Sequence, residues 1–149
     1  MKTTIVGLLL AMTFAGCSTP GPRSMNEAAA SAVPLFKDKP GNVLLKWVPG
    51  SPSVGSAMAS AMVGSVGLDS PTVADIHRII APADTTPINL VVSGADSRFA
   101  AKVAVAALNQ VPGMLPKLSL AFVGNKSDAA EIRGAVEARG GTFLFAPAN

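Results

Sequence analysis

Residues 88–97 read INLVVSGADS, and the stretch thirty residues later, 118–127, reads LSLAFVGNKS. Each stretch opens with an apolar run typical of a buried strand. Each then closes with glycine, polar residues and a serine, which favour a turn into a helix. The two strands are expected over 88–93 and 118–123, and a third apolar run predicts a strand over 142–146.

Helical spacing fills the gaps between these strands. Apolar side chains recur on one face over 97–110 and again over 127–139, where Asp128 and Glu131 suit the positive end of the helix dipole. Strands that alternate with helices in this way form parallel sheets with right-handed crossovers. The C-terminal half is therefore predicted to be a parallel βαβαβ unit.

An earlier part of the chain extends this unit. A strand is expected over Val43–Val48, and a helix is expected to begin at Pro71 and to end before Pro82. Between them, the small residues of 55–68 predict a helix packed tightly on the sheet; the alternative is a self-associating or membrane-inserting helix. We therefore expect residues 43–149 to form one small α/β domain with two or three layers.

The N-terminal residues follow a different pattern. Lys2 precedes a ten-residue apolar run over 5–14, and two small residues then lead to Cys17, the only cysteine of the chain. A positive end, a short apolar run and small residues are the layout of a secretory signal peptide. The run is too short to cross a bilayer, which takes about 20 residues. Residues 1–16 are therefore predicted to be a leader that is removed.

The stretch Phe14-Ala15-Gly16-Cys17 resembles the lipobox of bacterial lipoproteins, although that family usually has a branched aliphatic residue in place of Phe14. The resemblance implies a diacylglyceryl group on the Cys17 sulfur and an acylated amino group, with palmitate-type chains that anchor the protein to a membrane. Ser18 follows the cysteine, where inner-membrane lipoproteins commonly have Asp. The chain therefore resembles the outer-membrane class, with its domain facing the periplasm.

Residues 17–42 are interpreted as the lipidated cysteine and a Pro-rich tether. Four prolines interrupt regular structure there, namely Pro20, Pro22, Pro34 and Pro40. Residues 26–33 have the composition for two helical turns, but an isolated helix that short is marginal in water. The favoured interpretation is a flexible spacer that holds the domain away from the membrane.

Composition excludes several classes of protein. The 149-residue chain has 12 Lys and Arg against 9 Asp and Glu, and the basic residues form no run, which argues against nucleic acid as a partner. A single cysteine rules out an internal disulfide. One histidine and one cysteine are too few ligands for a transition-metal cluster. No metal and no cofactor are expected.

The two strand-to-helix turns contain the candidate ligand residues Asp96, Ser97, Asn125, Lys126 and Ser127. Ligands of open parallel sheets bind beyond the carboxyl ends of the strands, at a switch in strand order, and the two turns are expected to lie side by side at that edge. Backbone amides at two helix N-termini, with the lysine, would then hold a small anion. The favoured interpretation is ordinary turns in which both serines are N-caps.

Residues 125–128, Asn-Lys-Ser-Asp, resemble the guanine-reading Asn-Lys-x-Asp motif of GTPases. In that family the Asp128 carboxylate would hold the guanine edge and Lys126 would lie along the base. The phosphate-binding sequence Gly-x-x-x-x-Gly-Lys followed by Ser or Thr is absent from the chain. GTP binding is therefore not expected, and Asp128 is assigned to the first turn of a helix.

Catalytic candidates are few. His77 has no triad context in the sequence, no Gly-x-Ser-x-Gly elbow occurs, and Trp47 is expected in the core. The predicted function is a membrane-anchored lipoprotein that serves as a non-catalytic structural or accessory component of a cell-envelope assembly, with another envelope protein as its partner. The alternative is a periplasmic α/β domain that binds a small ligand or anion.

Overall fold

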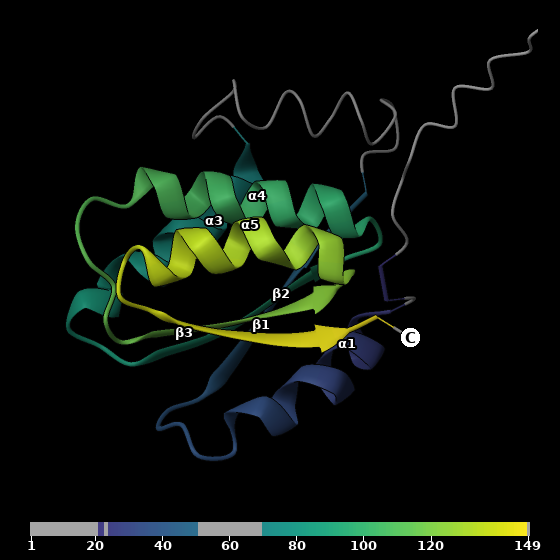
Figure 1. Ribbon diagram of the computed structural model, residues 1–149, viewed down its shortest axis with the longest axis horizontal. Helices are drawn as coiled ribbons and strands as arrows, with labels where there is room; N and C mark the ends of the chain where they lie inside the picture. Colours follow the sequence, from purple (N-terminus) through teal and green to yellow (C-terminus); the bar gives the residue numbers. More distant parts are fainter. Residues whose placement is uncertain (1–20, 23, 51–69, 149) are drawn as a thin grey trace, which may run out of the picture.

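The structure, a computed structural model, describes residues 21–22, 24–50 and 70–148. Four strands form one sheet in the order β1-β2-β3-β4, and every neighbouring pair is parallel (Figure 1). The strands are β1 (Val43–Val48), β2 (Ile88–Gly94), β3 (Leu118–Gly124) and β4 (Thr142–Pro147). The α/β class and the parallel βαβαβ unit predicted from the sequence are confirmed.

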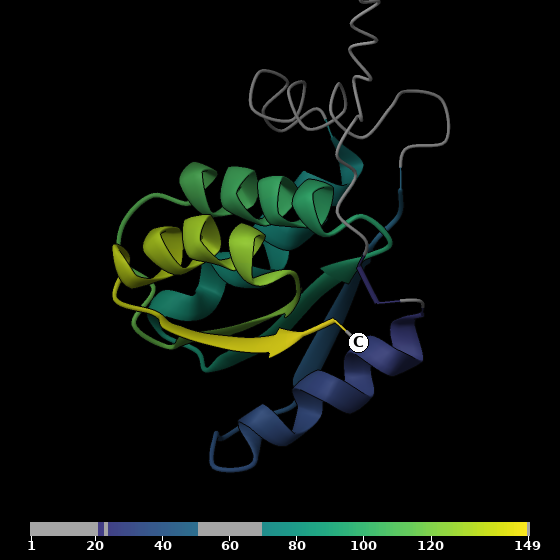
Figure 2. The ribbon, with the colours of Figure 1, turned by 45° about the vertical axis from the view of Figure 1, so that its right-hand side comes forward.

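Helices cover both faces of the sheet and give the domain three layers (Figures 1 and 2). On one face α3, α4 and α5 lie side by side, with α4 in the middle, and on the other face lies α1. The helices are α1 (Met25–Ala32), α3 (Pro71–Ile80), α4 (Ser97–Gln110) and α5 (Lys126–Glu137), with 3-10 helices η1 (Val33–Phe36) and η3 (Ala81–Asp84).

Successive residues of each central strand point to opposite helix layers. Leu90 and Leu120 are fully buried in the core beneath α3, α4 and α5. Val91 and Ala121, one residue further along, are fully buried in the smaller core beneath α1. Because both faces of β2 and β3 are covered, their sequences are nearly continuous apolar runs rather than alternating ones.

Helices α1 and η1 correct the interpretation of a flexible tether for residues 25–36. The Ser24 hydroxyl caps the helix, 3.2 Å from a backbone N–H of the first turn. Ala28 and Ala32 are fully buried and Phe36 is 4% exposed, all in the core on the second face of the sheet. Small side chains allow the helix to approach the strands closely, so packing stabilises a helix that would be marginal alone. Residues 25–36 form the third layer of the domain.

The other predicted elements that fall on described residues agree with the structure to within two residues at each end. The helix expected over 55–68 lies outside the described residues, as do the leader and Cys17. Within the described residues, no helix combines the length and apolar character needed to cross a membrane.

Candidate functional site

The turns that follow β2 and β3 lie side by side at the carboxyl edge of the sheet, as the sequence predicts. The two strands pair in parallel, with Ser93 opposite Val123. Ser97 joins the turns directly. Its hydroxyl accepts a hydrogen bond from the Asn125 backbone N–H at 2.8 Å and donates one to Asp128 Oδ2 at 2.7 Å. A buried side chain of the first turn thus fixes the backbone of the second.

The helix caps differ from the prediction that both serines are N-caps. Asp96 is the N-cap of α4, and its Oδ1 accepts a hydrogen bond from the Phe99 backbone N–H at 2.9 Å. Asn125 is the N-cap of α5 and makes no capping bond through its side chain. Each helix begins at or before its serine, so Ser97 and Ser127 lie inside the first turns. Ser97 is fully buried and Ser127 is exposed.

Close packing explains the glycine at the end of each of these strands. A Cβ atom on Gly94 would lie 2.5 Å from the carbonyl oxygen of Val48. A Cβ atom on Gly124 would lie 2.5 Å from Ser97 Oγ and 2.6 Å from the Phe122 ring. Neither approach is compatible with van der Waals radii, so packing alone accounts for both glycines without a bound phosphate.

The carboxyl edge differs from the predicted ligand crevice in its topology. Sheet order follows chain order from β1 to β4, so the strand order never reverses within the sheet of the described residues. Ligand crevices in open α/β sheets form where the order reverses. The Asp128 carboxylate, which guanine recognition would require, accepts the Ser97 hydrogen bond instead. These contacts agree with ordinary strand-to-helix turns.

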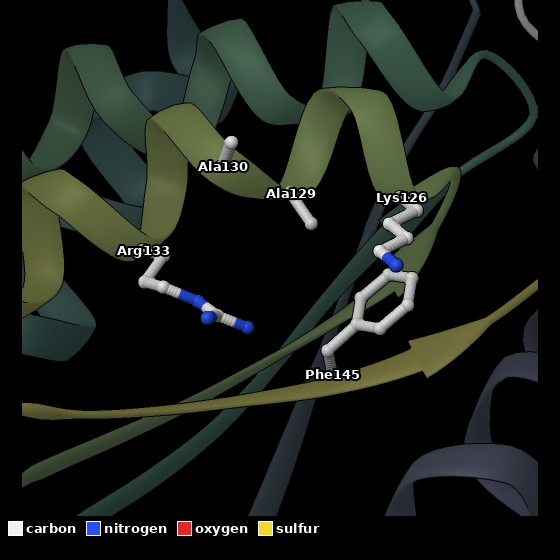
Figure 3. A pocket seen from close by; sticks show the side chains of 5 residues that line it. All are labelled: Lys126, Ala129, Ala130, Arg133 and Phe145. Atoms are coloured by element: carbon white, nitrogen blue, oxygen red, sulfur yellow. The ribbon is translucent and has the colours of Figure 1, made fainter.

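Lys126 is the one candidate residue among those that line a depression of about 220 Å³ between α5 and β4 (Figure 3). Ala129 and Ala130 line it on the helix side, and Arg133 and Phe145 complete the lining. Both basic side chains extend from α5 toward β4. The depression therefore combines two positive charges, an aromatic ring and two small residues that leave room beside the helix.

Sequence reasoning identified only Lys126 among the residues of this depression. Arg133 is held above the ring of Phe143, with its guanidinium carbon 5.4 Å from the ring centroid, a cation–π geometry. Phe143 and Phe145 are alternate residues of β4 and so share the face toward α5. The signal available in the sequence was this aromatic pair on a strand, opposite the basic residues of the preceding helix.

A second cluster of charges, away from the turns, has a structural role. Lys46 Nζ lies 2.7 Å from Asp75 Oδ2, which ties β1 to α3, and Arg78 lies 3.4 Å from the other carboxylate oxygen. The hydrogen bond and the charge of Lys46 hold the pKa of the Asp75 carboxyl below its ordinary value, against a smaller opposing effect of burial. His77, on the same helix, is half-buried. The Asp75 carboxylate therefore forms ion pairs with Lys46 and Arg78 rather than a catalytic dyad.

Trp47 is half-buried on β1, on the face of the sheet that α1 covers, where it packs against the smaller core. The described residues contain no group of three or more His, Cys, Asp or Glu side chains arranged to hold a metal ion. Comparison of the chain with protein families, curated proteins and solved structures finds no match.

Proposed function

We propose that this protein is a lipid-anchored lipoprotein of the cell envelope, held at the outer membrane by acyl chains on Cys17, with its α/β domain facing the periplasm. Its role is that of a non-catalytic structural or accessory component that contacts another envelope protein. The observation that carries the proposal is the leader that ends in Phe14-Ala15-Gly16-Cys17, with the only cysteine of the chain at the lipobox position.

The non-catalytic part of the proposal is supported by what the polar side chains do. Ser97 and Asp128 bond to each other across the two turns, and Asp96 caps α4. Ser93, buried at the end of β2, donates to the Val123 carbonyl oxygen at 2.9 Å. α/β domains usually bind substrates at this edge of the sheet. Here these four polar side chains instead hold the fold together.

Intact mass and membrane fractionation of the wild type beside Cys17→Ser test the anchor. We expect the wild type to be cleaved before Cys17, to gain the mass of a diacylglyceryl group and an acyl chain, and to fractionate with the outer membrane. The variant should lose both the lipid mass and the membrane association. An unmodified, freely released wild-type protein in a host that processes lipoproteins would overturn the proposal. With the anchor established, cross-linking at the membrane identifies the protein partner.

A second candidate function is the binding of a small anion with an aromatic or apolar body, in the depression of Lys126, Arg133 and Phe145. Two cations on one side of a site attract a carboxylate or phosphate group, and the ring of Phe145 offers an apolar surface for the rest of the molecule. The observation that favours this candidate is the coincidence of both basic side chains with the aromatic residues of β4 (Figure 3).

Titration with benzoate, followed by NMR, tests this second candidate. Benzoate combines a carboxylate with a ring, so we expect saturable shifts of the amides of Ala129 and Phe145. The double variant Lys126→Ala/Arg133→Ala should abolish the shifts. Lys37→Ala is the control, because it removes an exposed positive charge outside the depression. Shifts that do not saturate, or that survive in the double variant, would exclude the site.

A further inference from the structure

The start of the described chain is packed against the carboxyl edge of the sheet. The Gly21 backbone N–H donates a hydrogen bond to the Ala95 carbonyl oxygen at 3.1 Å. A Cβ atom on Gly21 would lie 2.0 Å from the carbonyl oxygen of Gly94, so only glycine fits there. Pro22, the next residue, is buried. The chain therefore enters the domain at the turn between β2 and α4.

Cys17 precedes this contact by only four residues. A fully extended chain spans at most about 3.6 Å per residue, so the Cys17 Cα lies within about 14 Å of the Gly21 Cα in any conformation. A 25-residue flexible tether would leave the orientation of the domain free. The contact at Gly21 restricts that freedom because it leaves only a few residues between the domain and an anchor at Cys17.

The carboxyl ends of all four parallel strands lie at the same edge as this contact. Figures 1 and 2 both show the purple start of the described chain beside the arrowheads of the strands and the label of the C-terminus. The Ala148 backbone N–H donates to the Gly124 carbonyl oxygen at 3.0 Å, which keeps the end of the chain at this edge as well. Lys126 is exposed there, at the start of α5.

We propose that the carboxyl edge of the sheet, formed by the turns over 94–97 and 124–127, faces the bilayer surface and lies against the lipid headgroups. The inference rests on the proposed lipid anchor at Cys17. Lys126, exposed at the start of α5 on this edge, then lies close to the headgroups and favours anionic lipids, since basic side chains near a negatively charged surface are attracted to it. The amino edge of the sheet faces away from the membrane and is the edge available to a periplasmic partner.

The two edges are far enough apart to be distinguished by experiment. Strand β2 has 7 residues, which span about 23 Å at roughly 3.3 Å per residue. Ser127 is exposed at the carboxyl edge, and Thr86 is exposed in the loop before β2, at the amino edge. Because the Cys17 sulfur carries the lipid, Ser127→Cys and Thr86→Cys each add a single free thiol to the lipidated protein.

The test uses the full lipidated protein with a fluorophore on either thiol, in phosphatidylethanolamine and phosphatidylglycerol vesicles that contain a headgroup-spin-labelled lipid. We expect several-fold stronger quenching of the label at Ser127→Cys than at Thr86→Cys. Equal quenching at both sites, or stronger quenching at Thr86→Cys, would overturn the orientation. Intact mass is recorded on the same samples, and absence of the lipid mass would overturn the anchor itself and the orientation with it.

A matched pair of glycine variants tests whether the Gly21 contact sets the orientation. Gly21→Ala places a methyl group against the Gly94 carbonyl, whereas Gly50→Ala meets no atom of the described residues within 4 Å. We expect the difference in quenching between the two labels to fall several-fold in Gly21→Ala and to persist in Gly50→Ala, with circular dichroism confirming that both remain folded. Persistence of the full difference in Gly21→Ala would contradict the assignment of the orientation to this contact.

Discussion

The turns after β2 and β3 look alike in sequence and differ in almost every contact. In the first, Asp96 is 7% exposed and Ser97 is fully buried. In the second, Lys126 and Ser127 are exposed. The first turn caps its own helix and fixes the second turn through the Ser97 hydroxyl, which bonds to the Asn125 N–H. The comparison shows that similar strand-to-helix turns use their serines differently, since Ser97 bonds to the second turn and to Asp128 whereas Ser127 is exposed.

The position of each helix in its layer explains the difference. Helix α4 packs between α3 and α5, so the residues at its start are enclosed on both sides. Helix α5 has a helical neighbour on one side only among the described elements, and its other side borders the depression beside β4. Burial therefore selects a small hydroxyl at Ser97, whereas the corresponding Ser127 is free to be almost any polar residue.

The largest effect is expected where the two turns are in direct steric contact. Gly124→Ala would place a Cβ atom 2.5 Å from Ser97 Oγ and within 2.7 Å of two carbons of the Phe122 ring. Both neighbours are fully buried and cannot move freely. We expect a loss of about 3 kcal/mol in the free energy of unfolding, at the upper end of typical overpacking costs. Urea unfolding followed by circular dichroism measures it.

Gly134→Ala is the matched control for this prediction. It lies within α5, is exposed, and its added Cβ would meet no atom within 4 Å in the part of the chain that the structure describes. Replacing glycine by alanine inside an exposed helix stabilises it by up to about 1 kcal/mol. Equal urea midpoints for the two variants would show that the contact between the turns is not tight.

The next largest effect is expected from the hydroxyl that joins the turns. Ser97→Ala removes the acceptor of the Asn125 N–H and the donor to Asp128, both in partly buried surroundings. Loss of such partners costs about 1–3 kcal/mol in the free energy of unfolding. A double-mutant cycle with Asp128→Ala should show that the two losses are not additive, because one bond is counted in both. Strict additivity would contradict a direct bond.

The sheet and the helices on its main face could be predicted because each signal is local. The apolar runs at Val43–Val48 and at residues 88–94 specify strands whatever surrounds them, and Pro71 with Pro82 marks both ends of a helix. The stability of helix α1 could not be predicted, because its signal is not local. Its stability comes from the burial of Ala28 and Ala32 on a distant face of the sheet, which no local pattern shows.

The candidate site was predicted in part. That the two turns are neighbours follows from parallel topology alone. The bond from Ser97 to Asp128 joins residues 31 positions apart, and it depends on how closely α4 and α5 pack. The depression that joins Lys126 to Phe145 depends in the same way on the distance between α5 and an edge strand. Such contacts come from tertiary packing and leave no periodic signal in the sequence.

A smaller effect is expected at the cap that only the first turn has. Asp96→Ala removes the acceptor of the Phe99 N–H and should cost about 1 kcal/mol in the free energy of unfolding. Asp96→Asn keeps an acceptor oxygen and is an equally good cap. It also removes charge from Oδ2, which is buried without a hydrogen-bond partner among the described residues. Urea unfolding should therefore place Asp96→Asn near the wild type and well above Asp96→Ala. A loss of similar size in both variants would contradict the capping role.

The smallest effect is expected from the serine that matches Ser97 in the second turn. Ser127 is exposed, and the N-cap position of α5 belongs to Asn125. Ser127→Ala should therefore change the free energy of unfolding by less than about 0.5 kcal/mol, as for most surface substitutions. Urea unfolding beside Ser97→Ala gives the direct comparison. If Ser127→Ala costs as much as Ser97→Ala, the serine does cap α5 and the two turns are equivalent. If the free energy of unfolding of Ser127→Ala is close to that of the wild type, only Ser97 supports the fold. The similar sequences of the two turns then reflect their shared position after a parallel strand.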